Sequence, residues 1–412
     1  MACEDAPMPK GRDLRLVVAA RFISFVGSAI APIATVFAVI QLTGSRSALG
    51  LVLACELGAA LAMILVGGVL ADRFPRKRVL IASDVLAGTA QLAIAVLMLT
   101  GNAEVWHLAL IGAVGGAAAG LFWPAFQGII PELATDEQLQ SANAVIALAS
   151  NSARIGGAAL GGLLVAATNP GIALLIDGLT FYASGLLVMG LRPVSVPKSG
   201  SNMVRALAEG WREFTSRRWL WVIVAQFSLL MAAQSAGFRV LGPIIAEEHL
   251  GGARAWGFIA AGEGVGLVAG ALVAARIRTK RPLLAATFAT YFHILPLALL
   301  IGPSPVVFIV AAAFANGIGM AVFNVFWTTA MQRRIPRDVL SRVSAYDALG
   351  SMILAPAGFL LAGPMASAFG TRGTLLICII AMAVANTAAL LEPQVRAREE
   401  PLHAEGTPAM IA

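Results

Sequence analysis

The stretch that decides the fold is GGVLADRFPRKR, residues 67–78. An apolar run that begins at Ala48 ends here in one acid and four bases. A weaker copy, GALVAARIRTKR, occupies residues 270–281, about two hundred residues further along the chain. A charged turn that is repeated between hydrophobic segments predicts a membrane protein whose two halves share one plan.

The composition is that of a protein solvated mainly by lipid. Of its 412 residues, 58% are hydrophobic and 12% are charged, whereas a soluble protein carries about 25% charged residues. A bilayer core needs about 20 apolar residues per helix, and runs of that length without strict alternation are helical. We therefore expect an all-α membrane protein with twelve transmembrane helices. The runs lie near 16–41, 48–71, 79–100, 105–130, 141–167, 170–191, 219–246, 255–275, 282–301, 305–331, 343–366 and 372–391.

The longest polar interval divides the chain in the middle. It begins as RPVSVPKSGS and continues with Val204, Leu207, Trp211 and Phe214 at helical spacing, which predicts an amphipathic helix on the membrane surface. The predicted domains are a six-helix bundle, a cytoplasmic linker with this helix, a second six-helix bundle and a cytoplasmic tail. Their boundaries are 1–191, 192–218, 219–392 and 393–412.

Lys and Arg gather in the loops of one side. The loops of the other side hold only Arg46, Arg254 and Arg372. Because cytoplasmic loops are the basic ones, both termini are expected in the cytoplasm, with the protein in the plasma membrane. The net charge of +7 then needs no nucleic-acid partner, because its bases line one face of the bilayer.

Several function classes lack their signatures. The sequence has no G-x-x-x-x-G-K-[ST] loop, so transport must draw its energy from a gradient rather than from ATP. It has no H-E-x-x-H, no G-x-S-x-G and no cluster of His and Cys. We therefore expect no enzyme activity, no metal and no cofactor. A non-transporting sensor is less favoured, because such proteins usually carry an added soluble domain.

The pattern Gly68-x-x-x-Asp72-Arg73-x-x-Arg76-Lys77 resembles the signature that members of the major facilitator superfamily carry between helices two and three. The resemblance covers nearly the whole chain. It implies two pseudo-symmetric six-helix bundles with a shared central cavity. The stretches 80–84, 152–162 and 335–343 are more specifically similar to bacterial exporters of siderophores and macrolides, and the whole resembles drug/proton antiporters.

The charged turn is a candidate gate. Asp72 stands beside cationic side chains, with which a carboxylate makes charge-assisted hydrogen bonds. Arg342, at the start of helix eleven, is its expected partner, since helix N-termini also favour anions. We expect this latch to close the cytoplasmic side. The alternative is that Arg76 and Lys77 only obey the orientation rule.

Charged residues inside the predicted helices are the candidate coupling and binding groups. A charge at the bilayer centre costs about 2.5–3.5 kcal/mol, so each should pair or face water. Glu56 and Glu263 lie at matching depths in helices two and eight and are the candidate proton carriers. The alternative for both is a structural acid bonded to a neighbouring helix. Arg154 and Arg239 are candidates for binding an anionic group or for pairing with these acids.

The remaining intramembrane charges are expected to be structural or to serve as anchors. Arg21 lies close enough to the inner surface to extend toward it, and Asp347 begins a helix there. Asp84, Asp177 and His293 belong to helices three, six and nine, which are peripheral in the fold that the resemblance implies. Asp84 is an expected partner of the charged turn.

Aromatic residues occupy nearly equivalent positions in helices four and ten. Such side chains suit a bulky, partly aromatic ligand, although packing or lipid contact is the alternative. The cavity candidates are Phe122, Trp123, Phe126, Phe323, Phe326 and Trp327.

The predicted function is efflux of an amphipathic organic compound, such as a drug, siderophore or other natural product. A monomer would work by alternating access and proton antiport, with the small-molecule substrate, protons and the lipid bilayer as its partners. The alternatives are an importer or an uncoupled facilitator of a small organic solute.

Overall fold

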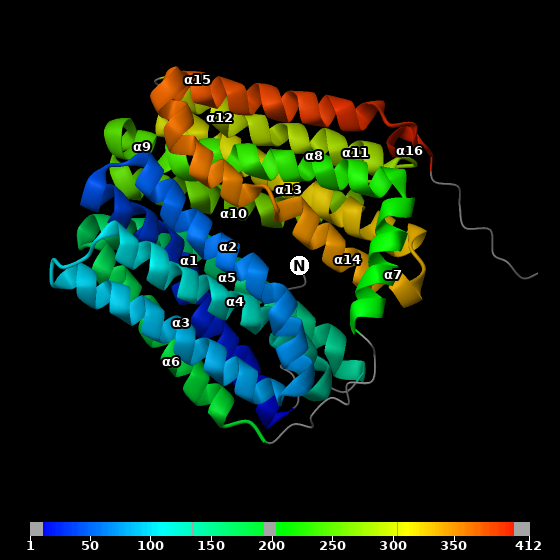
Figure 1. The fold of residues 1–412 in the computed structure, drawn as a ribbon, viewed down its shortest axis with the longest axis horizontal. Coiled ribbons are helices and arrows are strands. Elements are labelled where there is room, and N and C mark those ends of the chain that lie inside the picture. The colour runs from blue at the N-terminus through cyan, green and yellow to red at the C-terminus, as the bar shows by residue number, and fades with distance from the viewer. Residues whose placement is uncertain (1–10, 134–135, 193–202, 303, 399–412) are drawn as a thin grey trace, which may run out of the picture.

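The computed structural model describes residues 11–133, 136–192, 203–302 and 304–398. These residues form helices, and no strand occurs among them. Figure 1 shows the helices in two groups, with α1 to α6 in one group and α8 to α15 in the other. Helix α7 lies at one end of the molecule, which we call the linker end, and the turn between α1 and α2 lies at the opposite end.

The first group contains six long helices. They are α1 (Arg12–Thr43), α2 (Arg46–Arg73), α3 (Arg76–Leu99), α4 (Val105–Leu133), α5 (Asp136–Ala167) and α6 (Pro170–Met189). Local chemistry sets their ends. Gly44, at a φ of 62°, closes α1, and the Ser45 hydroxyl caps α2 by accepting from the Ala48 amide at 3.3 Å. Asn169 caps α6 in the same way, ahead of a proline in its first turn.

The helices of the second group are interrupted more often. The group contains α8 (Arg218–Gln234), the π-helical η1 (Ser235–Leu241), α9 (Gly242–Ile245), the π-helical η2 (Ala246–Leu250), α10 (Gly252–Arg276), α11 (Pro282–Ala289), the 3₁₀ turn η3 (Thr290–His293), α12 (Ile294–Leu300), α13 (Val306–Arg334), α14 (Arg337–Met352), α15 (Ala355–Leu391) and α16 (Pro393–Arg396). Helix α15 turns back on itself at Gly370, whose φ is 71°. Glycine adopts this left-handed conformation without the strain that a Cβ adds.

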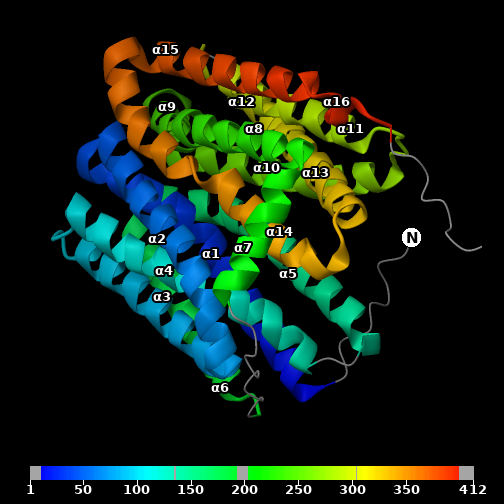
Figure 2. The same cartoon turned by 45° about the vertical axis from the view of Figure 1, so that its right-hand side comes forward.

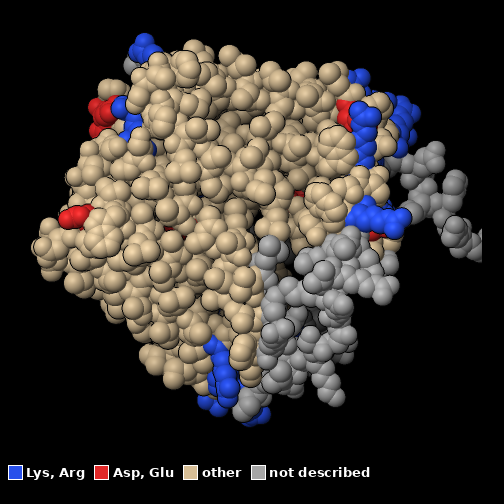
Figure 3. Space-filling view, viewed as in Figure 1, with Lys and Arg blue, Asp and Glu red and all other residues tan. Residues whose placement is uncertain are grey.

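Ten segments of the described residues are long and apolar enough to cross a membrane. The last, Arg342–Leu391, is 50 residues long and includes the reversal at Gly370. The all-α membrane fold is thereby confirmed, and the number of twelve crossings stays a prediction. In Figure 3, charged side chains gather toward the ends of the helices, and an uncharged surface separates them.

Glycines let the helices approach closely. A Cβ on Gly116 of α4 would lie 2.0 Å from the carbonyl oxygen of Glu56 in α2. A Cβ on Gly317 of α13 would lie 2.1 Å from that of Glu263 in α10. The hydrophobic effect does not drive apolar helices together in lipid, so their association depends on close packing of the backbones. Each group therefore contains an equivalent glycine-mediated helix crossing, α2 with α4 in the first and α10 with α13 in the second. A glutamate lies beside each crossing.

The amphipathic segment of the linker forms α7 (Met203–Ser216). In both views it runs from the start of α8 along α14 (Figure 2). The ring of Trp211 lies 5.4 Å from that of Tyr346 in α14, and Phe214 lies 6.1 Å from the same ring. This apolar face thus packs on the second group.

Candidate transport site

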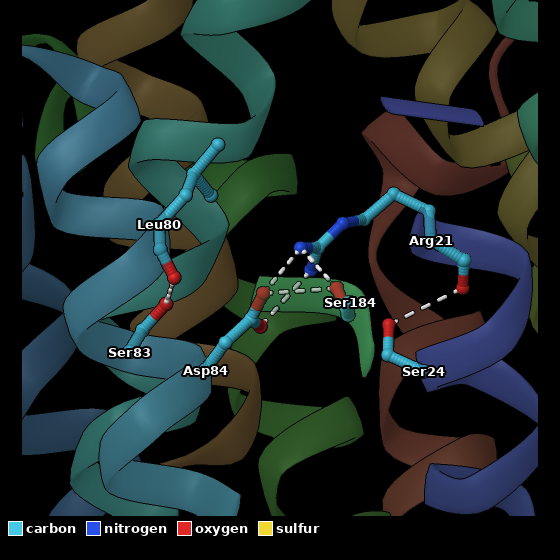
Figure 4. A network of polar contacts seen from close by, with 6 residues as sticks. All are labelled: Arg21, Ser24, Leu80, Ser83, Asp84 and Ser184. Atoms are coloured by element: carbon cyan, nitrogen blue, oxygen red, sulfur yellow. Dashed lines mark hydrogen bonds and ion pairs between the residues drawn. The ribbon is translucent and has the colours of Figure 1, made fainter. Parts of the chain in front are cut away.

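A buried ion pair joins three helices of the first group (Figure 4). Arg21 of α1 donates to the Asp84 carboxylate of α3 through Nη2 at 2.8 Å and Nη1 at 3.4 Å. The Ser184 hydroxyl of α6 accepts from Arg21 at 2.8 Å and donates to Asp84 at 2.9 Å. Arg21 and Asp84 are each 1% exposed. Arg21 therefore points into the bundle rather than toward the membrane surface, and Asp84 pairs with it rather than with the charged turn.

A cavity of about 370 Å³ adjoins this pair. Its lining combines the two charged groups with hydroxyls and aromatic rings. The residues that carry them are Arg21, Asp84, Ser24, Ser28, Ser83, Ser150, Phe25, Phe122, Trp123 and Phe181. The Arg21 guanidinium lies 4.5 Å from the centre of the Phe122 ring, within the range of cation–π attraction. Cavities of this size and lining bind small organic molecules.

The predicted aromatic cavity candidates fall into two sets. In α4, Phe122 stacks on the buried Phe126 at 5.1 Å, while Trp123 is 49% exposed and lines the cavity. In α13, Phe323 and Trp327 are buried. Phe323 stacks on Phe227 at 4.7 Å.

The second α13 ring also has a polar contact. The Trp327 indole donates to Asp347 of α14 at 3.0 Å and meets the Trp219 ring edge-on at 5.6 Å. Phe323 and Trp327 of α13 therefore contact other side chains inside the second group, whereas Phe122 and Trp123 of α4 border a cavity.

The two glutamates have different surroundings. Glu56 is exposed and lines a second cavity of about 170 Å³. Glu263 accepts a hydrogen bond from the Asn316 amide at 3.1 Å, and Asn316 is buried. Of the two predicted binding cations, Arg239 is exposed on η1, and the side chain of Arg154 lies outside the described part of the structure.

The bases of the charged turn bind helix ends of their own bundle. Arg76 donates to the Gly128 carbonyl in α4. Lys77 donates to the Met189 carbonyl at 2.9 Å and to that of Leu191. Cations stabilise the carbonyl ends of helices, so these two bases fasten the start of α3 to α4 and α6.

The predicted latch itself stays a prediction. The surroundings of Gly68 and the side chains of Asp72 and Arg73 lie outside the described part of the structure. Arg342 was expected at the start of its helix, but α14 begins at Arg337 and Arg342 is in its second turn. It lies beside α7, where a Cβ on Gly210 would lie 2.9 Å from the Arg342 Cβ.

Close contacts between the two groups gather toward the opposite end. A Cβ on Gly50 of α2 would lie 2.1 Å from the Phe359 carbonyl oxygen of α15. One on Gly162 of α5 would lie 2.5 Å from the Ala253 carbonyl oxygen of α10. An ion pair of 3.2 Å between Arg46 and Glu248 crosses the same end. At the linker end, α14 packs against α7 and α8 instead.

Residues 16–358 match the sequence profile of the Major Facilitator Superfamily. The chain belongs to this family. It is similar to the enterobactin exporter EntS of Shigella dysenteriae serotype 1 (strain Sd197), with 27% identity over 377 residues that cover 88% of this chain and 89% of that protein. The EntS protein of Escherichia coli O139:H28 (strain E24377A / ETEC) matches at the same identity and coverage.

Solved transporters share the fold at low sequence identity. A bacterial homologue of the human lysosomal transporter Spinster, in an inward-facing and unoccupied conformation, superposes with a TM-score of 0.73 at 15% identity. The superposition covers 94% of this chain and 98% of that transporter. The nucleoside transporter NupG superposes with a TM-score of 0.71 at 14% identity, over 92% and 98%. The major facilitator fold is thus confirmed, and the chain is a transporter rather than an enzyme.

The sequence interpretation missed the link between Arg21 and Asp84. One signal was present: an unlike pair of charges lies eight or nine residues inside α1 and α3, each counted from the linker end. Similar depth makes pairing possible, and the cost of a single charge in lipid favours it. Asp177 lines the same cavity as Glu56, and its predicted structural role stays a prediction.

Proposed function

We propose that this superfamily member exports an amphipathic organic compound in exchange for protons. The observation that carries the proposal is the unequal closure of the molecule. Close contacts join the two groups at the Arg46 end, whereas α14 packs on its own group at the linker end. A carrier that binds its substrate on one side and releases it on the other needs one state that is closed at the Arg46 end and another that is closed at the linker end.

The cavity beside Arg21 is the proposed substrate pocket. Its aromatic rings and apolar walls suit a flat hydrophobic body, and its serine hydroxyls and guanidinium suit polar substituents. The similarity to an enterobactin exporter supports efflux as the direction. Siderophores, drugs and related natural products combine these two properties.

Proton coupling is assigned to Glu56 or Glu263. Each is an acid within a predicted membrane helix and stands beside the glycine crossing of its own bundle. Protonation from outside, opening of the Asp72–Arg342 latch and exchange of the proton for substrate complete the cycle. The protein works as a monomer in the plasma membrane, with both termini in the cytoplasm.

Everted membrane vesicles that contain the protein test direction and coupling together. With enterobactin as the probe, acidifying the lumen should drive accumulation, and a protonophore should abolish it. Vesicles with both Glu56→Gln and Glu263→Gln should accumulate no more than empty vesicles. Accumulation in right-side-out vesicles instead would establish import, and uptake insensitive to the gradient would establish an uncoupled facilitator; either result refutes the proposal.

A further inference from the structure

Asp177 of α6 is a buried acid that the transport cycle above does not use. Its side chain is 0% exposed. Its carboxylate faces the neutral side chains of Gln91 and Thr180, and no ion pair with a basic side chain occurs among the described residues. It lies tightly against α1, since a Cβ on Gly27 would lie 2.5 Å from Asp177 Oδ1. A buried carboxylate without a counter-charge is costly, so this carboxyl group needs a further explanation.

The explanation lies in what the carboxyl group faces. Asp177 lines the cavity of about 170 Å³ between α1, α2, α3, α4 and α6, and Glu56 lines the same cavity. Because the two acids line one cavity, a negative charge on either one disfavours ionisation of the other. Other polar groups in the wall come from Ser28, Thr35 and Gln91. These groups are neutral, so they cannot balance two negative charges.

No basic side chain lines this cavity in the described part of the chain. The neighbouring cavity contains Arg21, whose guanidinium is bound to Asp84 and Ser184. Tyr182, the other titratable group on α6 near this level, exchanges a hydrogen bond of 2.7 Å with Thr89. Two ionised carboxylates that line one cavity repel each other, and a single proton held between them relieves that repulsion.

We propose that Glu56 and Asp177 together bind one proton, as a shared site inside the first helix group. The site takes up H⁺ on one carboxylate oxygen and releases it again, with no other change in bonding. This inference deepens the proposed function, on which it rests, by adding Asp177 to the coupling machinery. It also favours Glu56 over Glu263, whose carboxylate already has an amide donor.

The shared site is adjacent to the proposed substrate pocket. The two cavities have five lining residues in common, namely Ser28, Ala87, Gly115, Ala119 and Phe181. Substrate that fills the larger cavity therefore presses on the walls of the smaller one. This contact couples cargo and proton within one bundle, through residues that belong to α1, α3, α4 and α6.

Infrared difference spectroscopy of the purified protein in lipid nanodiscs, recorded between acidic and neutral pH, tests the site without any transport. The carboxylic-acid C=O band reports the protonated acids and shifts in D₂O. Asp177→Asn and Glu56→Gln should each remove or move the same band, because one proton serves both groups. Glu104→Gln is the matched control, since that exposed acid binds Trp106 outside the bundle and its loss should leave the band in place.

A band that is lost in Glu56→Gln but unchanged in Asp177→Asn overturns the inference. If Asp177→Asn does not fold, Asp177→Glu replaces it, because this variant keeps an acid and should keep the band. Adding Glu56→Gln to Asp177→Glu should then alter that band. An unaltered band overturns the inference. A band that responds to Na⁺ in place of choline identifies a sodium site instead and also overturns it. Proton-driven transport by Asp177→Asn with wild-type pH dependence refutes the inference alone, whereas uncoupled transport with a shared band refutes only the proposed function.

Discussion

The two halves of the molecule place polar side chains at corresponding positions but differ in charge. In the first half, Arg21, Asp84 and Ser184 join α1, α3 and α6. About two hundred residues later, Gln226 donates to Asn386 at 2.6 Å and to Thr290 at 3.3 Å, which joins α8, η3 and α15. The same junction therefore forms with neutral groups in one half and with an ion pair in the other.

This difference separates packing from function. Neutral hydrogen bonds are sufficient to join the three helices, as the second half shows. A buried ion pair carries a desolvation penalty that its attraction does not always repay. The charge in the first half is therefore not needed for the junction, and it borders the cavity that we assign to substrate.

Breaking the ion pair should have the largest effect. Asp84→Asn leaves the Arg21 cation buried without its counter-charge, which should cost about 3–5 kcal/mol of stability. Thermal unfolding of the purified protein measures this loss. The double variant Arg21→Gln with Asp84→Thr copies two of the three side chains of the second junction and should recover most of the stability without recovering transport. Equal instability of the single and double variants would contradict the comparison.

The glycine crossings should respond alike in both halves, in contrast to the junctions. Gly116→Ala and Gly317→Ala each force a Cβ against a carbonyl oxygen of the facing helix, and overpacking of this kind costs about 1–3 kcal/mol. Gly112→Ala is the control in the same helix as Gly116, because nothing lies within 4 Å of its added Cβ. Unfolding temperatures compare the three. A loss confined to one half would show that the crossings are not equivalent.

The neutral junction should matter less than the charged one. Gln226→Leu removes the hydrogen bonds to Asn386 and Thr290, and a hydrogen bond between membrane helices is worth about 1 kcal/mol. We expect a small drop in unfolding temperature with transport retained in vesicles. Loss of transport in this variant, at normal stability, would place function in the second junction too.

The ion pair across the closed end should have the smallest effect on stability. Arg46→Gln removes a partly exposed pair with Glu248, and such pairs contribute about 0–1 kcal/mol. The closed state should nevertheless become less populated, and distances between spin labels at that end should lengthen in a larger fraction of molecules. Arg254→Gln, an exposed base at the same end, should leave the distribution unchanged. Identical distributions in both variants would exclude Arg46 from closure.

Sequence alone predicted the features that depend on composition and periodicity. The all-α membrane fold followed from the apolar runs, and the superfamily followed from the charged turn. Helix α7 followed from its stripe of Val204, Leu207, Trp211 and Phe214, two members of which contact Tyr346. These features need no knowledge of which helices face each other.

The features that depend on which helices face each other could not be predicted from composition and periodicity. Depth placed Arg21 and Asp84 near one level, but only the packing of both α1 and α3 on α6 directs them together. The α4 and α13 rings have equivalent sequence positions, yet Trp123 meets a cavity and Trp327 meets Asp347. The hydrogen-bonding pattern of a helix also cannot be read from an apolar run: the helix predicted over 219–246 contains the π-helical η1, and a second π-helical segment, η2, begins at its last residue.

The two π-helical segments, η1 and η2, set the direction in which the chain beyond α8 continues. A π turn holds one residue more than an α turn, so each segment changes which way the following side chains point. Glu248 lies in η2 and pairs with Arg46 of α2, whereas α8 packs on α14 and α15. The wider turns therefore allow one continuous helical stretch to contact its own group along α8 and the first group at its far end.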